Sequence, residues 1–341
     1  MTLDFFKALP KAELHCHLLG TVRRATFIEL AQKAGAAIAR EEIEAFYVRG
    51  EKPVGVLRAL RTLDEVIRHP EQLHRLTAEY LEDAAAHGVR YAEIFWNPTG
   101  TARVSGIPYA KAQDAIVRAM REAKGIIGRL IPAIDREATP AEALEAVRWV
   151  IEARAPEVVG LGIDYSEVDR PPELFAEAYR LAAKAGLPRT AHAGEFGCPW
   201  TNVRDALELL GVERIDHGYT ALDNPEFARR CAERGIVFTV VPSNSYYLRT
   251  LSKERWALDH PIRHMRTAGL RVHPNTDDPT LHNVTPTLAW EMMARHFGYS
   301  LDDLRACMMN GLDAAWIDAE TRQRWRRDWG AEFDELRGRM Q

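Results

Sequence analysis

Two histidines separated by one residue, His15 and His17, end a short apolar segment near the start of the chain. Side chains alternate along a β-strand, so both imidazoles point to the same side if this segment is a strand. An isolated pair of this kind indicates little, but His192, His217 and Asp277 also follow apolar segments. Three neutral imidazoles and a carboxylate can hold Zn²⁺ or a similar cation and leave one position for water.

Hydrolysis at such a metal also needs an acid, and Glu195 is placed to supply it. Water bound to the cation loses its proton near neutral pH. Attack of the hydroxide on an electron-poor ring carbon or a carbonyl also requires an acid that protonates the group becoming basic. Glu195 lies three residues beyond His192 and directly after Gly194, where it can supply that acid. The alternative is a helix N-terminal charge that the helix dipole favours.

These side chains can meet only if the strands that carry them open on the same side. Short β-rich runs alternate with amphipathic helical stretches along almost the whole chain, as in βα units of a parallel sheet. Strands are predicted at 12–17, 90–95, 128–134, 158–163, 189–193, 214–217, 237–241 and 271–275. Eight strands with interleaved helices predict an α/β fold, a (β/α)₈ TIM barrel, whose reactive residues lie at the C-terminal strand ends. A doubly wound sheet is the alternative, but Gly160 and Gly162 lack the third glycine of its phosphate-binding fingerprint.

The predicted first and second strands are too far apart for a single crossover, which indicates a helical insertion at about 20–88. Within it, apolar residues recur at helical spacing: Leu57, Leu60, Leu63, Val66 and Ile67. The insertion either packs on the barrel or acts as a lid. Residues 313–341, rich in Arg, Glu, Asp and Trp, predict a terminal amphipathic helix pair. Residues 1–341 are then one domain.

Composition excludes several classes of protein. A formal net charge of −4, from 45 Lys and Arg against 49 Asp and Glu, argues against a nucleic acid partner. The longest apolar runs are far shorter than the roughly 20 residues that span a bilayer, and the first residues are not basic. We therefore expect a cytoplasmic protein with no membrane partner and a small-molecule substrate. The cysteines are scattered without a C-x-x-C pair, which favours reduced thiols. The oligomeric state stays open.

Four segments occur in order at spacings that suit a barrel: 9–17 (LPKAELHCH), 192–195 (HAGE), 216–219 (DHGY) and 275–279 (NTDDP). Together they resemble the motifs of the adenosine/adenine deaminase family of the amidohydrolase superfamily, and the resemblance covers almost the whole chain. It implies zinc-dependent hydrolytic deamination of an aminopurine to the 6-oxopurine and ammonia. The aminopurine would be adenosine, adenine or a modified adenine nucleoside.

The resemblance also implies a role for each matching residue. The zinc ligands would be His15, His17, His192 and Asp277. Glu195 matches the donor of a proton to the purine nitrogen beside the attacked carbon, and His217 matches the residue that orients the attacking water. Asp278 matches the residue that contacts the far ring nitrogen. One Zn²⁺ per chain is expected, because dinuclear relatives carry a carboxylated lysine on the fourth strand and 158–164 has no lysine.

Two departures from the family pattern affect the substrate-binding end. Leu19 occupies the position where members acting on adenosine usually have an Asp that meets the ribose, and leucine cannot hydrogen-bond a hydroxyl. Residues 164–167 (DYSE) resemble the Asp-Ser-Ser-Glu run of adenine-specific members, with Tyr165 substituted. The predicted substrate-binding residues are Leu19, Ser166, Glu167, Gly194 and Asp278. We expect the catalytic residues to follow the family pattern. The part of the site that meets the substituent on the purine, the substituent end, is expected to be altered, so that it accepts a free base or a modified purine nucleoside with an apolar group.

The sequence leaves two other functions open. A different metallohydrolase on the same barrel would cleave an amide, lactone or phosphoester without releasing ammonia. A catalytically silent barrel that binds a nucleoside would have no reason to keep both the ligand set and Glu195. Among the remaining histidines, His282 follows Asp278 closely enough to reach the pocket.

Overall fold

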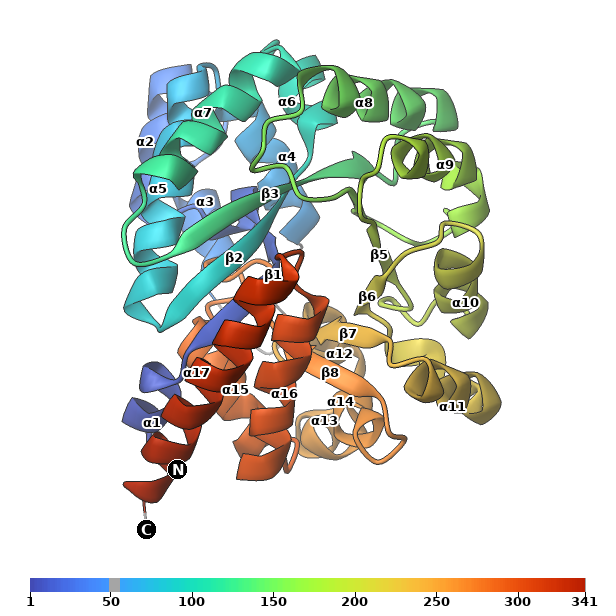
Figure 1. Ribbon diagram of the computed structural model, residues 1–341. Coiled ribbons are helices and arrows are strands. Elements are labelled where there is room, and N and C mark those ends of the chain that lie inside the picture. The colour runs from blue at the N-terminus through green and yellow to red at the C-terminus, as the bar shows by residue number, and fades with distance from the viewer. Residues whose placement is uncertain (49–55, 341) are drawn as a thin grey trace.

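Eight parallel strands form the centre of the protein in the computed structural model, which describes residues 1–48 and 56–340 (Figure 1). The strands are β1 (Lys11–His17), β2 (Val89–Trp96), β3 (Ile127–Asp135), β4 (Gly162–Asp164), β5 (Thr190–Ala193), β6 (Arg214–His217), β7 (Val237–Val240) and β8 (Arg271–Pro274). They pair in chain order as β1–β4 and β5–β8. Parallel bridges from Leu161 to Arg189 and from Cys16 to Asp277 join the two groups. The predicted barrel is confirmed.

The fourth strand is shorter than predicted. It begins at Gly162, whereas the sequence placed its start at residue 158. Val158 makes only an isolated bridge to Leu130. Gly160 lies against the indole of Trp316, so close that a Cβ would be 2.2 Å from a ring carbon. Packing against this distant residue takes the segment out of regular strand pairing, which a local apolar pattern cannot show.

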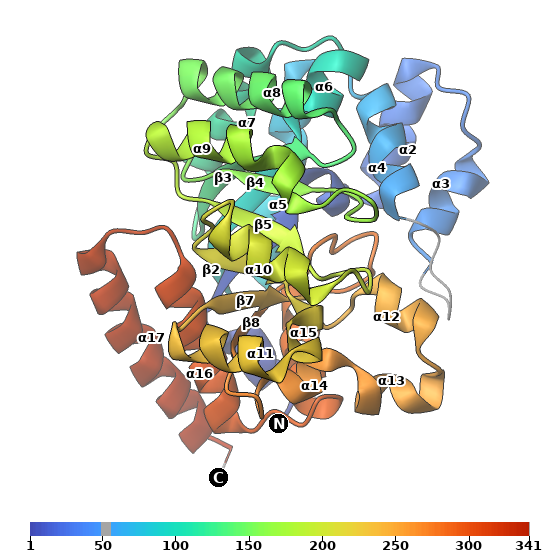
Figure 2. The same cartoon turned by 90° about the vertical axis from the view of Figure 1, so that its right-hand side faces the viewer.

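Five helices lie among the described residues between β1 and β2, which are 18–48 and 56–88. They are η1 (Leu18–Thr21), α2 (Arg24–Ala34), α3 (Arg40–Phe46), α4 (Val56–Val66) and α5 (Pro70–Ala86). The apolar stripe of α4 faces inward, since Leu63, Val66 and Ile67 are fully buried. Figure 2 shows α2, α3 and α4 on the side of the barrel opposite α17, together with α12 and α13.

The remaining helices surround the barrel. They are α1 (Leu3–Ala8), α6 (Pro98–Val104), α7 (Tyr109–Glu122), α8 (Pro140–Ala153), η2 (Pro172–Phe175), α9 (Ala176–Lys184), α10 (Trp200–Glu208), η3 (Tyr219–Asp223), α11 (Pro225–Glu233), α12 (Ser245–Thr250), α13 (Lys253–Asp259), α14 (Pro261–Met265), α15 (Pro286–Arg295), α16 (Leu301–Ala314) and α17 (Ala319–Gly338). Many begin with a side-chain cap followed by proline, as at α8, where Thr139 and Glu142 form a capping box.

The predicted C-terminal helix pair is wrong. Residues 313 and 314 complete α16, and one helix of 20 residues, α17, follows and packs beside α16 (Figure 1). Asp318 caps the start of α17 by accepting a hydrogen bond from the Thr321 N–H. Gly330, the glycine inside the helix, is buried against α16 near Arg305 and Met309, so tertiary packing keeps the helix continuous.

A buried ion pair lies inside the barrel. Arg214 Nη1 is 2.6 Å from Glu93 Oε2, and both side chains are inaccessible to solvent. Glu93 Oε1 accepts hydrogen bonds from the Tyr91 hydroxyl (2.7 Å) and the Trp316 N–H (2.6 Å). The pair thereby connects the barrel strands to the segment between α16 and α17.

Removing one partner of this pair is expected to destabilise the fold strongly. Glu93→Gln leaves the buried Arg214 guanidinium without its counter-charge, a change that costs about 3–5 kcal/mol. Chemical unfolding should show this loss. Glu332→Gln is the matched control, because Glu332 pairs with Arg90 on the surface, where an ion pair contributes less than about 1 kcal/mol. Equal losses in the two variants would contradict the prediction.

Candidate active site

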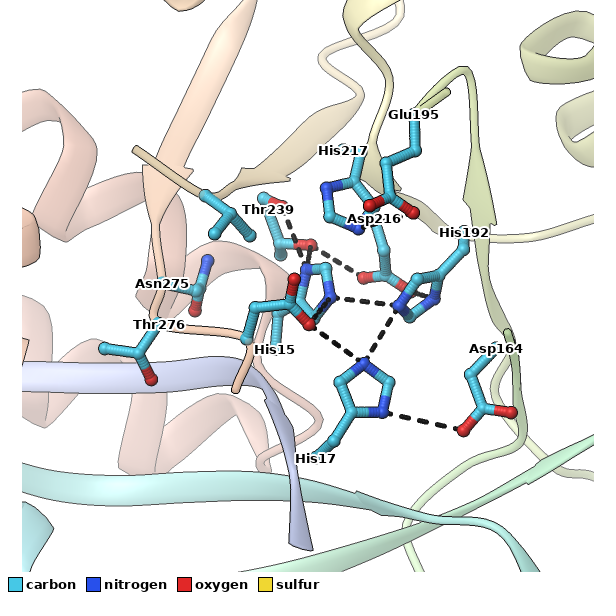
Figure 3. Close-up of polar contacts among 12 residues, drawn as sticks. His15, His17, Asp164, His192, Glu195, Asp216, His217, Thr239, Asn275 and Thr276 are labelled. Atoms are coloured by element: carbon cyan, nitrogen blue, oxygen red, sulfur yellow. Dashed lines mark hydrogen bonds and ion pairs between the residues drawn. The ribbon is translucent and has the colours of Figure 1, made fainter. Parts of the chain in front are cut away.

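Three imidazole nitrogens and one carboxylate oxygen meet where β1 and β5 end and β8 gives way to its loop (Figure 3). His192 Nε2 lies 3.0 Å from His15 Nε2 and 3.1 Å from His17 Nε2. Asp277 Oδ1 lies 3.1 Å from His17 Nε2 and 3.5 Å from His15 Nε2. Ligands at tetrahedral zinc distances are separated from one another by about 3.3 Å. The spacing of these four atoms therefore fits a zinc ion.

In each of the three histidines, the contact made by Nδ1 indicates whether Nε2 is free to bind a metal. Each Nδ1 faces an oxygen acceptor. Thr239 O is 3.1 Å from His15 Nδ1. The carboxylate oxygens are slightly farther away: Asp164 Oδ2 is 3.5 Å from His17 Nδ1, and Asp216 Oδ2 is 3.5 Å from His192 Nδ1. Acceptors at these positions favour a proton on Nδ1 and leave a lone pair on Nε2. Three Nε2 lone pairs that converge in this way would be satisfied by a cation.

The backbone around Asp277 fixes its carboxylate against the histidines. The Asp277 N–H donates to His15 O (2.9 Å), and Asp277 O accepts from the His17 N–H (2.8 Å). Asp277 is in the left-handed region with φ of 66°, which is unfavourable for a residue with a side chain. Such strain persists where the surroundings over-determine the conformation, and it is typical of functional sites.

His217 lies beside this group. The ligating atoms of His15, His192, His217 and Asp277 all lie within 4.8 Å of one another. Burial, and then the nearby His15, lower the pKa of His217 well below its usual value, so the ring is neutral at pH 7. Its Nε2 is 3.4 Å from Glu195 Oε2. His17 Nε2 lies 3.1 Å from both His192 Nε2 and Asp277 Oδ1, so either His17 or His217 can complete a set of four ligands with His15, His192 and Asp277.

Glu195 reaches toward the same point from the loop after β5 (Figure 3). Gly194 precedes it with φ of 69°, and a Cβ there would lie 2.5 Å from Thr220 Oγ1, so only glycine fits. Burial, and then the charge of Asp277, raise the pKa of the Glu195 carboxyl well above its usual value. The raised pKa favours the protonated carboxyl, which is the form that a proton donor needs.

A cavity of about 160 Å³ lies beside the convergent atoms. It is lined by His17, Val56, Leu57, Leu60, Asp164, Tyr165, His192, Glu195, Phe196, His217, Arg249, Asp277, Asp278 and His282. Burial, and then the charge of Asp277, raise the pKa of Asp278 well above its usual value, so this carboxyl can donate a hydrogen bond. The structure thus brings Glu195, His217 and Asp278 to one cavity that His17, His192 and Asp277 also line.

The other residues predicted to bind substrate do not line this cavity. Leu19 is buried in η1, and Ser166 and Gly194 lie outside the lining. Glu167 points away to accept hydrogen bonds from the N–H groups of Gly194 (3.0 Å) and Glu195 (3.1 Å). Glu167 therefore supports the backbone of the loop after β5.

Sequence reasoning missed several lining residues, among them Leu57, Leu60, Phe196 and Arg249. Leu57 and Leu60 belong to the predicted stripe on α4, but the stripe alone does not show that the helix lies over the barrel mouth. His282, which the sequence placed within reach of the pocket, does line it.

A closed parallel barrel with this ligand set defines a metal-dependent hydrolase fold. The model of the adenosine deaminase family matches residues 10–328, and the chain belongs to this family. It is 33% identical over 332 residues to an adenine deaminase from Streptomyces coelicolor, covering 94% of this chain and 95% of that protein. An adenine deaminase from Ralstonia nicotianae is 32% identical over 327 residues, covering 93% and 92%.

Solved structures agree with this assignment. An amidohydrolase from Burkholderia ambifaria with bound zinc is 62% identical, with a TM-score of 0.97, covering 98% of this chain and 93% of that chain. An adenine deaminase from Arthrobacter aurescens is 30% identical, with a TM-score of 0.87, covering 96% and 100%. None of the helices formed by residues 1–48 and 56–340 has the length and apolarity needed to cross a membrane.

Proposed function

We propose that this chain removes the amino group of an aminopurine by hydrolysis, giving the 6-oxopurine and ammonia, with one zinc ion per chain. The observation that carries this proposal is the pairing of two buried carboxyls, Glu195 and Asp278, with the four convergent ligand atoms around one small cavity. The names of the relatives, adenine deaminases, support it, as does the zinc in the Burkholderia structure. A cytoplasmic location and the absence of a nucleic acid partner stay predictions.

Zinc held by His15, His17, His192 and Asp277 would supply a water activated for attack at neutral pH. Neutral His217 can accept a proton from the attacking water, and its ring is oriented by the Tyr219 hydroxyl, 3.3 Å from Nδ1. The Glu195 carboxyl donates its proton to the ring nitrogen beside the attacked carbon.

Asp278 completes the set by hydrogen bonding to the far ring nitrogen, which fixes the plane of the purine. Because these groups meet charge that develops only as the ring carbon becomes tetrahedral, they stabilise the transition state more than the substrate.

A screen for ammonia release tests the function. The purified, zinc-loaded protein is assayed with aminopurine bases, nucleosides and N6- or 5′-modified analogues. Release from at least one aminopurine, with equimolar 6-oxopurine, is expected. A different metallohydrolase would turn over an amide, lactone or phosphoester and release no ammonia from these compounds. A catalytically inactive barrel would bind metal and purine without turnover. The absence of ammonia release, from either cause, would refute the proposal.

The substituent end of the cavity favours a free base or a purine with an apolar group. Leu57, Leu60, Tyr165 and Phe196 add aliphatic and aromatic surface to the cavity, whose lining also includes the charged Arg249. Leu19 is buried and offers no hydrogen bond to a sugar hydroxyl. Highest efficiency with unmodified adenosine would contradict this preference.

Tyr165 is expected to limit substrate size. Its ring lines the cavity, and its φ of 67° holds the backbone in a strained conformation. Tyr165→Ser removes the ring, and we expect kcat/KM for adenosine relative to adenine to rise about tenfold or more. Tyr165→Phe keeps the ring and should leave the ratio unchanged. A ratio that is the same in all three proteins would exclude the role.

A further inference from the structure

The loop after β7 supplies a contact to the catalytic carboxyl that the reaction scheme above does not use. Asn244, which is buried, donates a hydrogen bond from Nδ2 to Glu195 Oε1 over 3.0 Å. Glu167 meanwhile holds the backbone N–H groups of Gly194 and Glu195. With the backbone fixed from below, the remaining freedom of Glu195 is in its side-chain torsions, and the Asn244 contact restrains those.

The orientation of the Asn244 amide follows from its second role. Asn244 is the N-cap of α12, and its Oδ1 accepts hydrogen bonds from the N–H groups of Tyr246 (3.0 Å) and Tyr247 (3.4 Å). Backbone N–H groups can only donate, so the atom that faces them must be the amide oxygen. The NH₂ group therefore faces Glu195, and Glu195 Oε1 must act as an acceptor.

We propose that Asn244 is a positioning residue for the deamination: it holds Glu195 Oε1 as an acceptor and so places the carboxyl proton on Oε2. Glu195 Oε2 is the oxygen that lies 3.4 Å from His217 Nε2. This inference rests on the proposed function for the identity of the proton acceptor, the purine ring nitrogen.

The same contact favours proton transfer energetically. As the ring nitrogen takes the proton, the O–H bond at Oε2 breaks and its electron pair stays on the carboxylate. A hydrogen bond to a carboxylate is roughly twice as strong as one to a neutral carboxyl. The Asn244 hydrogen bond therefore strengthens as the transition state forms, which lowers the barrier.

Asn244→Asp separates this role from the helix cap. Aspartate caps helices about as well as asparagine, so α12 should stay folded, but it has no N–H to donate. We expect kcat to fall about ten- to a hundredfold, with KM within threefold of the wild-type value and bound zinc and melting temperature unchanged. Asn244→Ser, which caps but is too short to reach Glu195, should lower kcat without adding a charge.

Asn224→Asp is the matched control. Asn224 caps α11 through a hydrogen bond from the Phe227 N–H (3.0 Å) and does not line the cavity. This variant should keep the wild-type kcat. If Asn244→Asp also keeps it, Asn244 is only a cap and the inference is wrong.

A second measurement does not require turnover. The infrared band of the protonated Glu195 carboxyl, assigned by its loss in Glu195→Gln, should move to higher wavenumber in Asn244→Ser, because its carbonyl oxygen loses a hydrogen bond. If the wild-type protein releases no ammonia but the band moves, the proposed function fails and the positioning contact stands. No such band, or a band that does not move, overturns the inference.

Discussion

Glu195→Gln is expected to abolish measurable ammonia release from every aminopurine that the wild-type protein accepts, while the metal stays bound. Glutamine has nearly the same shape as the protonated carboxyl and can still accept the Asn244 hydrogen bond, but its amide does not supply a proton to the ring nitrogen. Loss of general acid catalysis lowers kcat by about 10²–10⁴-fold. Ammonia release and zinc content, measured on the same preparation, check both parts.

The pH dependence follows from the raised pKa of Glu195. The carboxyl is protonated and active through neutral pH, so kcat/KM should fall only as the pH rises through that raised pKa. Glu208→Gln, an exposed change at the end of α10, is the control and should leave both rate and profile unchanged. A Glu195→Gln variant that keeps more than a tenth of the wild-type kcat would exclude the proton-donor role.

The sequence could predict that the histidines and Asp277 converge, because their placement depends on short-range rules. Alternation along a strand places His15 and His17 on one side, and the barrel places the ends of β1, β5, β6 and β8 around one opening. The position of each side chain follows from its own strand and from the closure of the sheet, whereas the choice of ligands rests on the resemblance to the family.

The substituent end could not be predicted in the same way. Leu57 and Leu60 reach the cavity only because α4 folds over the barrel mouth, and Phe196 only because of the turn that Gly194 permits. Asn244 reads locally as a helix cap, and its contact with Glu195 joins residues 49 positions apart. The shortened β4 and the continuous α17 have the same cause, since packing against Trp316 and α16 decides them.

Removal of the metal is expected to abolish activity and lower the melting temperature. The chelated protein should regain both when zinc is added, with saturation at one ion per chain. A ligand present at a thousand times its Kd stabilises the folded state by about 4 kcal/mol. Acid should also release the metal, because protonation of the imidazoles competes with binding. Full activity after chelation, with no metal detected, would contradict the ligand assignment.

Two histidines compete for the fourth ligand position, and substitution distinguishes them. His15, His192 and Asp277 belong to both possible sets, with either His17 or His217 as the remaining ligand. If His17 is the ligand, His17→Ala should lose zinc at concentrations where His217→Ala retains it, although both lose turnover.

The exposed His264→Ala is the control for this pair and should retain both zinc and rate. Retention of zinc by His17→Ala together with its loss from His217→Ala would reverse the assignment. It would also remove His217 from the role of proton acceptor, because a nitrogen bound to the metal has no lone pair left for water.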